Sequence, residues 1–179
     1  MKKYLAVLLL AVSAAGTALA QTKPTEPASY DIKNFMRVNE HLCTGGQPSM
    51  DDLAKMKAEG IKAILNLRRP SEYNFEEEAA KAKDLGMKFF NIPVDSNAPK
   101  DEQVEEFLKI MADKENRPMF LHCTSANRVG AFWLIRRVLV DGVKQEDALK
   151  DAEKMGLTNQ KTKEFALDYI ARHAKKVEK

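Results

Sequence analysis

Short apolar runs alternate with amphipathic segments along most of this 179-residue chain. Each apolar run has the length of a buried strand, and each amphipathic segment repeats its apolar residues at helical spacing. The predicted strands lie at residues 35–38, 42–44, 61–67, 88–94 and 118–121. The predicted helices lie at residues 49–60, 75–85, 101–111, 145–155 and 159–174, and a further buried helix begins near residue 131.

Strands that alternate with helices predict the α/β fold class. Parallel strands need crossover connections, usually helical, so the expected architecture is a central, mostly parallel sheet flanked by helices. In open sheets of this kind, ligands bind beyond the carboxyl ends of the strands. Residues 66–68, Asp95 and Cys123 each follow a predicted strand. The sequence therefore predicts one site, at one edge of the sheet.

The first 20 residues have the organisation of a secretory signal peptide. Lys2 and Lys3 precede an apolar stretch, and Ala18 and Ala20 mark a cleavage point after Ala20. The stretch is short for a membrane span, which makes an uncleaved anchor the weaker alternative. Residues 21–30 are expected to form a flexible linker before a single domain at residues 31–179. We expect a periplasmic or secreted protein without a stable membrane anchor.

Charge and size restrict the partners. The whole chain has 29 basic and 26 acidic residues, and since Lys2 and Lys3 belong to the leader, the mature chain has 27 against 26. A nearly neutral protein lacks the basic surface of a nucleic-acid binder, so we predict no nucleic-acid partner. A mature length of about 159 residues suits one domain, which we expect to be a monomer.

The candidate chemistry lies where the strand at residues 118–121 meets the helix that follows. Cys123 stands at this junction, where helix amides lack internal partners and the helix dipole favours negative charge. The same field stabilises a thiolate. Arg128 adds a planar fork that can hold two phosphate oxygens. The alternative is that Cys123 is simply a small core residue.

Two cysteines remain in the mature chain, Cys43 and Cys123. Exported proteins usually pair their cysteines, so one expectation is a disulfide between them. A domain of this size does not need such a bridge for stability. Cys43 is therefore a candidate redox partner that would protect the reactive thiol of Cys123 reversibly from further oxidation.

The junction resembles the phosphate-binding loop of the cysteine-dependent tyrosine and dual-specificity phosphatases. The residues that carry the resemblance are His122, Cys123, Arg128 and Gly130. Three further motifs are similar to a family of small bacterial phosphatase-like domains, often called beta-lactamase-hydrolase-like. These motifs are Gly-Gln-Pro-Ser at residues 46–49, Asn-Leu-Arg at residues 66–68 and Ile-Pro-Val at residues 92–94. The similarity runs from about residue 35 to residue 156.

The resemblance implies a dual-specificity-phosphatase-like fold and assigns roles to particular residues. Cys123 would be the nucleophile that forms a phosphocysteine, and Arg128 would hold the phosphoryl oxygens. Asp95 would be the general acid, with Asp101 and Glu102 as weaker substitutes. The loop residues that would bind the phosphoryl group are Thr124, Ser125, Ala126 and Asn127. An alternative role for Asp95 is to form a turn by binding its own backbone.

Neighbouring residues are expected to support these roles. His122 should orient the cysteine loop, with its side chain pointing away from Cys123 because strand residues alternate. Arg68 is expected to pair with Glu72 or Glu76. The three histidines of the chain do not have the spacing of metal ligands. We predict no metal ion and no other cofactor.

Two features depart from the usual phosphatase loop. Four residues instead of five separate Cys123 from Arg128, and Val129 stands where a hydroxyl residue is usual. A loop of four also occurs in rhodanese-type sulfurtransferases, whose cysteine carries a persulfide. The sequence thus predicts an exported hydrolase of a phosphomonoester, on a phosphorylated small molecule or a phosphoprotein, with phosphotyrosine among the candidates. The alternatives are a rhodanese-like sulfurtransferase and a catalytically silent phosphate- or anion-binding module.

Overall fold

The structure, a computed structural model, describes residues 29–174. The predicted signal peptide and all but the last two residues of the predicted linker lie outside the described residues. In the described part of the chain, no helix is long and apolar enough to cross a membrane.

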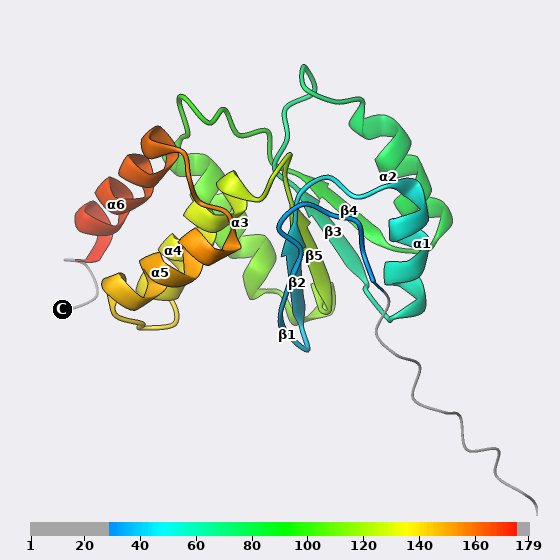
Figure 1. The fold of residues 1–179 in the computed structure, drawn as a ribbon, viewed down its shortest axis with the longest axis horizontal. Helices are drawn as coiled ribbons and strands as arrows, with labels where there is room; N and C mark the ends of the chain where they lie inside the picture. The colour runs from blue at the N-terminus through cyan, green and yellow to red at the C-terminus, as the bar shows by residue number, and fades with distance from the viewer. Residues whose placement is uncertain (1–28, 175–179) are drawn as a thin grey trace, which may run out of the picture.

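Five short strands form the central sheet (Figure 1). The strands are β1 (Met36–Asn39), β2 (Leu42–Gly45), β3 (Ala63–Asn66), β4 (Lys88–Asn91) and β5 (Met119–His122). Their order across the sheet is β1-β2-β5-β3-β4. Only the β1–β2 pair is antiparallel, and the other three pairs are parallel. This arrangement confirms the predicted α/β fold with a mostly parallel sheet.

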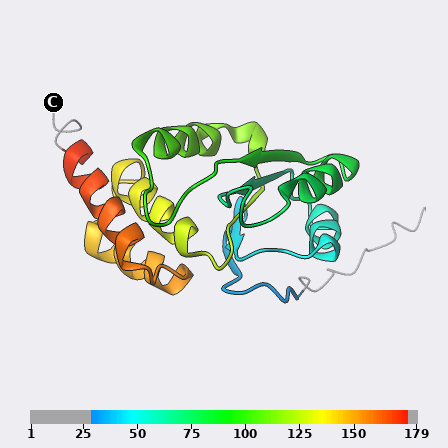
Figure 2. The same ribbon diagram turned by 90° about the horizontal axis from the view of Figure 1, so that it is seen from above.

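Helices cover both faces of the sheet (Figures 1 and 2). They are α1 (Met50–Ala58), α2 (Phe75–Asp84), α3 (Asp101–Ala112), α4 (Asn127–Leu139), α5 (Gln145–Met155) and α6 (Gln160–Ala174), with a short 3₁₀ turn, η1 (Lys114–Asn116). One core cluster joins α3, α4, α5 and α6 to one face of the sheet. A second cluster joins α1 and α2 to the opposite face. The ends of the predicted helices agree with these bounds to within a few residues.

The predicted capping box at the start of α1 is present. The Ser49 hydroxyl accepts a hydrogen bond from the Asp52 amide at 3.1 Å, and the Asp52 carboxylate accepts one from the Ser49 amide at 3.1 Å. This exchange satisfies two amides that a helix start leaves without partners. Residues 46–48 thus connect the end of β2 to the capped start of α1.

Alternation along β5 decides which core each residue enters. Leu121 belongs to the cluster under α3 to α6, whereas Phe120 belongs to the cluster under α1 and α2. Both residues are fully buried. Side chains on one strand alternate between the two faces, so His122 and Cys123 must also point to opposite sides.

The positions of the two cysteines contradict the predicted pairing. Cys43 lies level with Phe120 in the sheet and belongs to the cluster under α1 and α2. Cys123 belongs to the cluster on the other face. Both thiols are free and buried. Because the backbone of the sheet separates them, a Cys43–Cys123 bridge does not fit this fold, and Cys43 is not the redox partner that its presence in an exported chain suggested.

Candidate active site

The loop between β5 and α4 presents a row of free backbone amides. Ala126 has a left-handed backbone conformation with a φ of 63°, which turns the chain sharply into the first residue of α4. The Ala126 amide faces the turn after β2 through a bridge between Ser125 and Gly46, but among the described residues the amides of Thr124, Ser125 and 127–129 donate no hydrogen bond to another protein atom. Such a row of donors at a helix start is an anion-binding site.

The carbonyl groups of the same loop are bound from outside. The Gln47 amide donates to the Thr124 carbonyl at 3.4 Å, and the Asn34 side chain donates to the Ser125 carbonyl at 2.9 Å. Two glycines permit this close packing. A Cβ atom on Gly46 would lie 2.8 Å from the Thr124 carbonyl oxygen, and one on Gly156 would lie 3.0 Å from the Ser125 carbonyl oxygen. The outer contacts leave the amides free for a ligand.

A pocket of about 320 Å³ lies in front of this loop. Cys123 contributes to its lining although the residue is only 1% exposed, so the thiol lies at the bottom. The remaining lining residues are all polar or charged. They are Arg69, Glu72, Asp95, Ser96, Asn97, Thr124, Ser125, Asn127, Arg128 and Asn159.

Arg128 enters the pocket from the first turn of α4 and is held on several sides. Its two terminal nitrogens donate to the two carboxylate oxygens of Glu72, at 2.9 Å and 2.7 Å. One of them also donates to the Val94 carbonyl at 2.8 Å, and the other donates to the Thr124 hydroxyl at 3.0 Å. Paired contacts of this kind fix the plane of a guanidinium group.

The ion pair perturbs both partners. Burial acts to raise the pKa of Glu72, but hydrogen bonds from Arg128 and Arg69 outweigh it and lower that pKa to about 2. Burial acts to lower the pKa of Arg128, whereas the hydrogen bond to Glu72 and the charge of Cys123 raise it above its ordinary value. Both side chains therefore stay charged at neutral pH.

The expected partner of Arg68 is only partly correct. One terminal nitrogen of Arg68 donates to the backbone carbonyl of Glu72 at 2.7 Å and the other to the Gln47 side chain at 2.9 Å. The Glu72 carboxylate lies 3.9 Å from the Arg68 Nε atom. The Glu72 carboxylate binds Arg128 and Arg69 more closely, at 2.7 Å and 2.9 Å.

Asp95 lines the same pocket as Cys123, as the position after β4 predicted. One of its oxygens accepts a hydrogen bond from Arg69 at 2.7 Å, and the other accepts one from the Asn97 amide at 2.9 Å. The second contact is the turn-forming bond that was the alternative role for Asp95. The two roles are compatible, because the side chain still reaches the pocket.

The predicted loop residues fall into two groups. Thr124, Ser125 and Asn127 line the pocket, whereas the Ala126 side chain is fully buried and contributes only its backbone. His122 is also fully buried and lies 2.7 Å from Glu78 of α2, on the face away from the pocket. The expected orientation of His122 is therefore present.

Sequence reasoning missed several pocket residues, Glu72 above all. Glu72 stands 56 positions before Arg128 in the chain, and a lone acidic residue in a loop carries no sign of such a partner. Arg69, Asn97 and Asn159 were also missed. Across residues 29–174, no group of three or more His, Cys, Asp or Glu side chains is placed to hold a metal ion.

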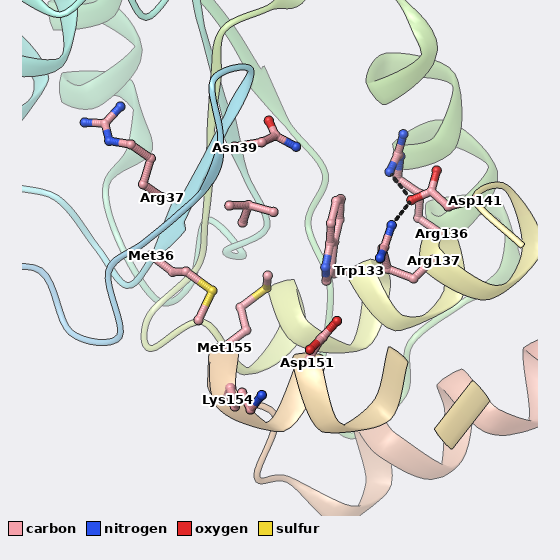
Figure 3. A pocket seen from close by; sticks show the side chains of 11 residues that line it. Met36, Arg37, Asn39, Trp133, Arg136, Arg137, Asp141, Asp151, Lys154 and Met155 are labelled. Atoms are coloured by element: carbon pink, nitrogen blue, oxygen red, sulfur yellow. Dashed lines mark hydrogen bonds and ion pairs between the residues drawn. The ribbon is translucent and has the colours of Figure 1, made fainter. Parts of the chain in front are cut away.

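A larger pocket, of about 540 Å³, lies between β1, α4 and α5 (Figure 3). Trp133 forms part of its wall, and Arg136 and Arg137 both bind Asp141, at 2.7 Å and 3.0 Å. The lining contains no cysteine, serine or histidine. The smaller pocket, which contains the thiol, is therefore the candidate active site.

Residues 17–170 match the model of a family described as "DSP-PTPase phosphatase fused to NAD+ Kinase". The chain belongs to this family of cysteine-dependent phosphatases. Cys123 and Arg128 lie within the matched range, together with every residue that lines their pocket. The predicted membership of the tyrosine and dual-specificity phosphatase superfamily is confirmed.

Individual relatives agree with this assignment. The chain is 30% identical over 123 residues to the beta-lactamase hydrolase-like protein of Agrobacterium fabrum, which corresponds to 66% of this chain and 28% of the relative. The chain thus spans little more than a quarter of that relative's length. This similarity supports the more specific resemblance to beta-lactamase-hydrolase-like domains.

Two solved structures have the same fold. The core catalytic domain of the PP-IP phosphatase SIW14 from S. cerevisiae, in complex with citrate, aligns with a TM-score of 0.66 and 20% identity over 82% of this chain and 94% of that chain. TpbA of P. aeruginosa, in complex with pTyr, aligns with a TM-score of 0.61 and 19% identity over 76% of this chain and 82% of that chain.

The Glu72–Arg128 pair gives a first testable prediction. Glu72→Gln should lower kcat/KM for any phosphoester at least about tenfold and destabilise the fold by about 1–3 kcal/mol, because a buried charged donor loses its ionised partner. A Glu whose pKa falls from 4.5 to about 2 on folding adds stability that is fully present above pH 4.5 and is lost as the pH falls through about 2. The stability difference between wild type and variant should therefore shrink over that range.

Urea unfolding at several pH values between 7 and 2, together with steady-state kinetics at pH 7, measures these effects. Glu76→Gln is the matched control, since Glu76 is exposed and lies in the same acidic region of the chain. Equal stability and activity of the two variants at pH 7 would contradict the assigned role of Glu72.

Proposed function

We propose that this protein hydrolyses phosphomonoesters through a phosphocysteine intermediate on Cys123. The observation that supports the proposal most directly is the row of free amides beside a buried thiol and a fixed guanidinium group. Phosphoryl transfer depends mainly on positioning and on stabilising negative charge at the phosphoryl oxygens. Amides, helix dipole and Arg128 together supply that stabilisation.

The reaction has two steps. The Cys123 thiolate attacks phosphorus, the bond between phosphorus and the leaving oxygen breaks, and Asp95 gives its proton to that oxygen. A water molecule then attacks the phosphocysteine, Asp95 takes a proton from the water, and the bond between sulfur and phosphorus breaks. Phosphate leaves and the thiolate is restored.

The polar lining of the pocket bears on the substrate. Apart from Cys123, every lining residue is polar or charged, and none is aromatic. A phosphotyrosine ring gains binding energy from aromatic or aliphatic walls, which this pocket lacks. We therefore favour a phosphorylated polyol or sugar, the class to which the PP-IP substrate of SIW14 belongs, over the pTyr bound to TpbA.

One assay pair tests the reaction class. Hydrolysis of an aryl phosphate and of an inositol phosphate, and sulfur transfer from thiosulfate, are compared on reduced wild type and on Cys123→Ser. We expect phosphate release by the wild type, preference for the inositol phosphate, and a loss of at least about 10³-fold in the variant, because a serine hydroxyl is a much weaker nucleophile than a thiolate. Sulfur transfer without phosphate release would reject the phosphatase in favour of a sulfurtransferase. If the protein shows neither phosphate release nor sulfur transfer but still binds phosphate, the result would indicate a catalytically silent anion-binding module.

Asp95→Asn tests the general acid separately. With an alkyl phosphate, whose leaving group needs a proton, turnover should fall by about 10² to 10⁴. With an aryl phosphate that carries a good leaving group, the loss should be much smaller. Kinetics on a series of esters with graded leaving groups measures the difference, and equal losses across the series would exclude Asp95 as the acid.

We also propose that the protein is exported. The supporting observation is the leader-like sequence of residues 1–20, with small residues at Ala18 and Ala20. Expression of the full chain in a bacterial host should yield a processed product whose N-terminus is Gln21. Mass spectrometry of the purified protein identifies the terminus, and an unprocessed product retained in the cytoplasm would contradict export.

A further inference from the structure

The carboxylate proposed as the general acid stands on a loop with few restraints. Residues 95–99 lie between β4 and α3, and none of them is buried. Within the loop, the Asn97 amide donates to the Asp95 side chain at 2.9 Å, and the Ala98 amide donates to the Asp95 carbonyl at 3.1 Å. Among the residues that the structure describes, one hydrogen bond joins residues 95–99 to another part of the chain, and its donor is Arg69. Apart from packing, the position of the Asp95 carboxylate therefore depends on this contact.

Arg69 reaches Asp95 from the loop that follows β3. The strands β3 and β4 are parallel, so the loops after them leave the same end of the sheet (Figure 1). One terminal nitrogen of Arg69 donates to Asp95 at 2.7 Å, whereas its Nε atom donates to Glu72 at 2.9 Å. The same oxygen of Glu72 accepts a hydrogen bond from Arg128 at 2.9 Å. Arg69 thus joins the loop of Asp95 to the ion pair that holds Arg128.

The side chains of Arg128, Glu72, Arg69 and Asp95 form a series of alternating charges along the pocket, and all four line it. An isolated ion pair between side chains that are 39% and 36% exposed, as Arg69 and Asp95 are, adds little stability because water screens the charges. Here Glu72 already holds Arg69, through the Nε contact and through a turn in which the Glu72 amide donates to the Arg69 carbonyl at 3.0 Å. An ordered guanidinium group loses less conformational entropy when it binds a carboxylate. The contact can therefore orient Asp95 even though it stabilises the fold only slightly.

We propose that Arg69 is the positioning residue for the general acid. The inference rests on the proposed function, because it concerns the proton that Asp95 gives to the leaving oxygen. Asp95 is held at both of its oxygens, by the Asn97 amide on one and by Arg69 on the other. Because the Asn97 amide belongs to the same loop as Asp95, the contact with Arg69 is the one that sets the carboxylate relative to the thiol. A general acid must lie within hydrogen-bond reach of the leaving oxygen, and a small misplacement lowers the rate substantially.

A series of phosphate esters with graded leaving groups tests the inference. We would measure kcat/KM for wild type, Arg69→Gln, Asp95→Asn and the double variant, and verify the folding of each by urea unfolding. This parameter covers the steps up to formation of the phosphocysteine, in which a poor leaving group needs a proton. Lys100→Gln is the matched control, because Lys100 is an exposed basic residue at the far end of the same loop.

We expect Arg69→Gln to lower kcat/KM about tenfold to a hundredfold for an alkyl phosphate, whose leaving group needs a proton. For an aryl phosphate with a good leaving group, the loss should be less than about twofold. In the Asp95→Asn background, Arg69→Gln should have almost no further effect, because no acid remains to be positioned. Arg69→Lys, which keeps the charge, should recover part of the loss, and Lys100→Gln should match the wild type.

Several results would overturn the inference. Equal losses for all esters would mean that Arg69 acts through Glu72 and Arg128 rather than through Asp95. Independent, additive losses in the double variant would have the same meaning. An unaffected Arg69→Gln beside an impaired Asp95→Asn would reject the role of Arg69 and leave the proposed function standing, whereas no phosphate release by the wild type would reject both.

A second variant applies if Arg69→Gln does not fold. Arg69→Lys retains the positive charge but lacks the planar fork that binds Asp95 and Glu72 from two different nitrogens. Its smaller loss of kcat/KM should show the same dependence on the leaving group. A loss of equal size for alkyl and aryl phosphates in Arg69→Lys would overturn the inference.

Discussion

The backbone amides of the loop between β5 and α4 must remain without protein partners if they are to bind an anion. A loop normally satisfies its amides internally or with water, so the surrounding structure has to hold this one open. It does so through the loop carbonyls, which bind the Gln47 amide and the Asn34 side chain. Close approach at Gly46 and Gly156 makes these contacts possible. The turn after β2 and the turn after α5 therefore both pack against the carbonyl side of the loop and support its conformation.

Two carboxylates hold the residues on either side of this loop. Glu72 fixes Arg128 in front of the thiol, and Glu78 contacts His122 behind it. Buried ion pairs add little stability compared with apolar packing, because each charge loses its hydration. The value of the Glu72–Arg128 pair is orientation, since two parallel hydrogen bonds fix the plane of a guanidinium group that lines the pocket. Both carboxylates come from the segment between β3 and β4, which links the two ends of the site.

Family membership concerns the class of reaction, whereas the residues that line the pocket concern the choice of substrate. The match to a dual-specificity phosphatase family covers residues 17–170, a range that includes the loop, its cysteine and its arginine. The specificity of a phosphatase depends on the walls above that loop, which here consist of Arg69, Asn97, Asn159 and their polar neighbours. Polar side chains of this kind can form hydrogen bonds with hydroxyl and phosphate groups, which is why we propose a phosphorylated polyol or sugar as the substrate. The solved structures of TpbA with pTyr and of the PP-IP phosphatase SIW14 share the fold with this chain at only 19% and 20% identity. Their ligands therefore do not indicate the substrate of this protein, and the proposed substrate class rests on the residues that line the pocket.

The sequence alone predicted the α/β class, the strand and helix positions, and the thiol between β5 and α4. These features depend on local periodicity, caps and motifs, which are visible in one stretch of chain at a time. Only the tertiary structure placed Glu72 on Arg128 and Glu78 on His122, and it separated Cys43 from Cys123. Those outcomes depend on which segments meet across the sheet and on which face each side chain enters. Strand order and register decide both, and no pattern within a single segment records them.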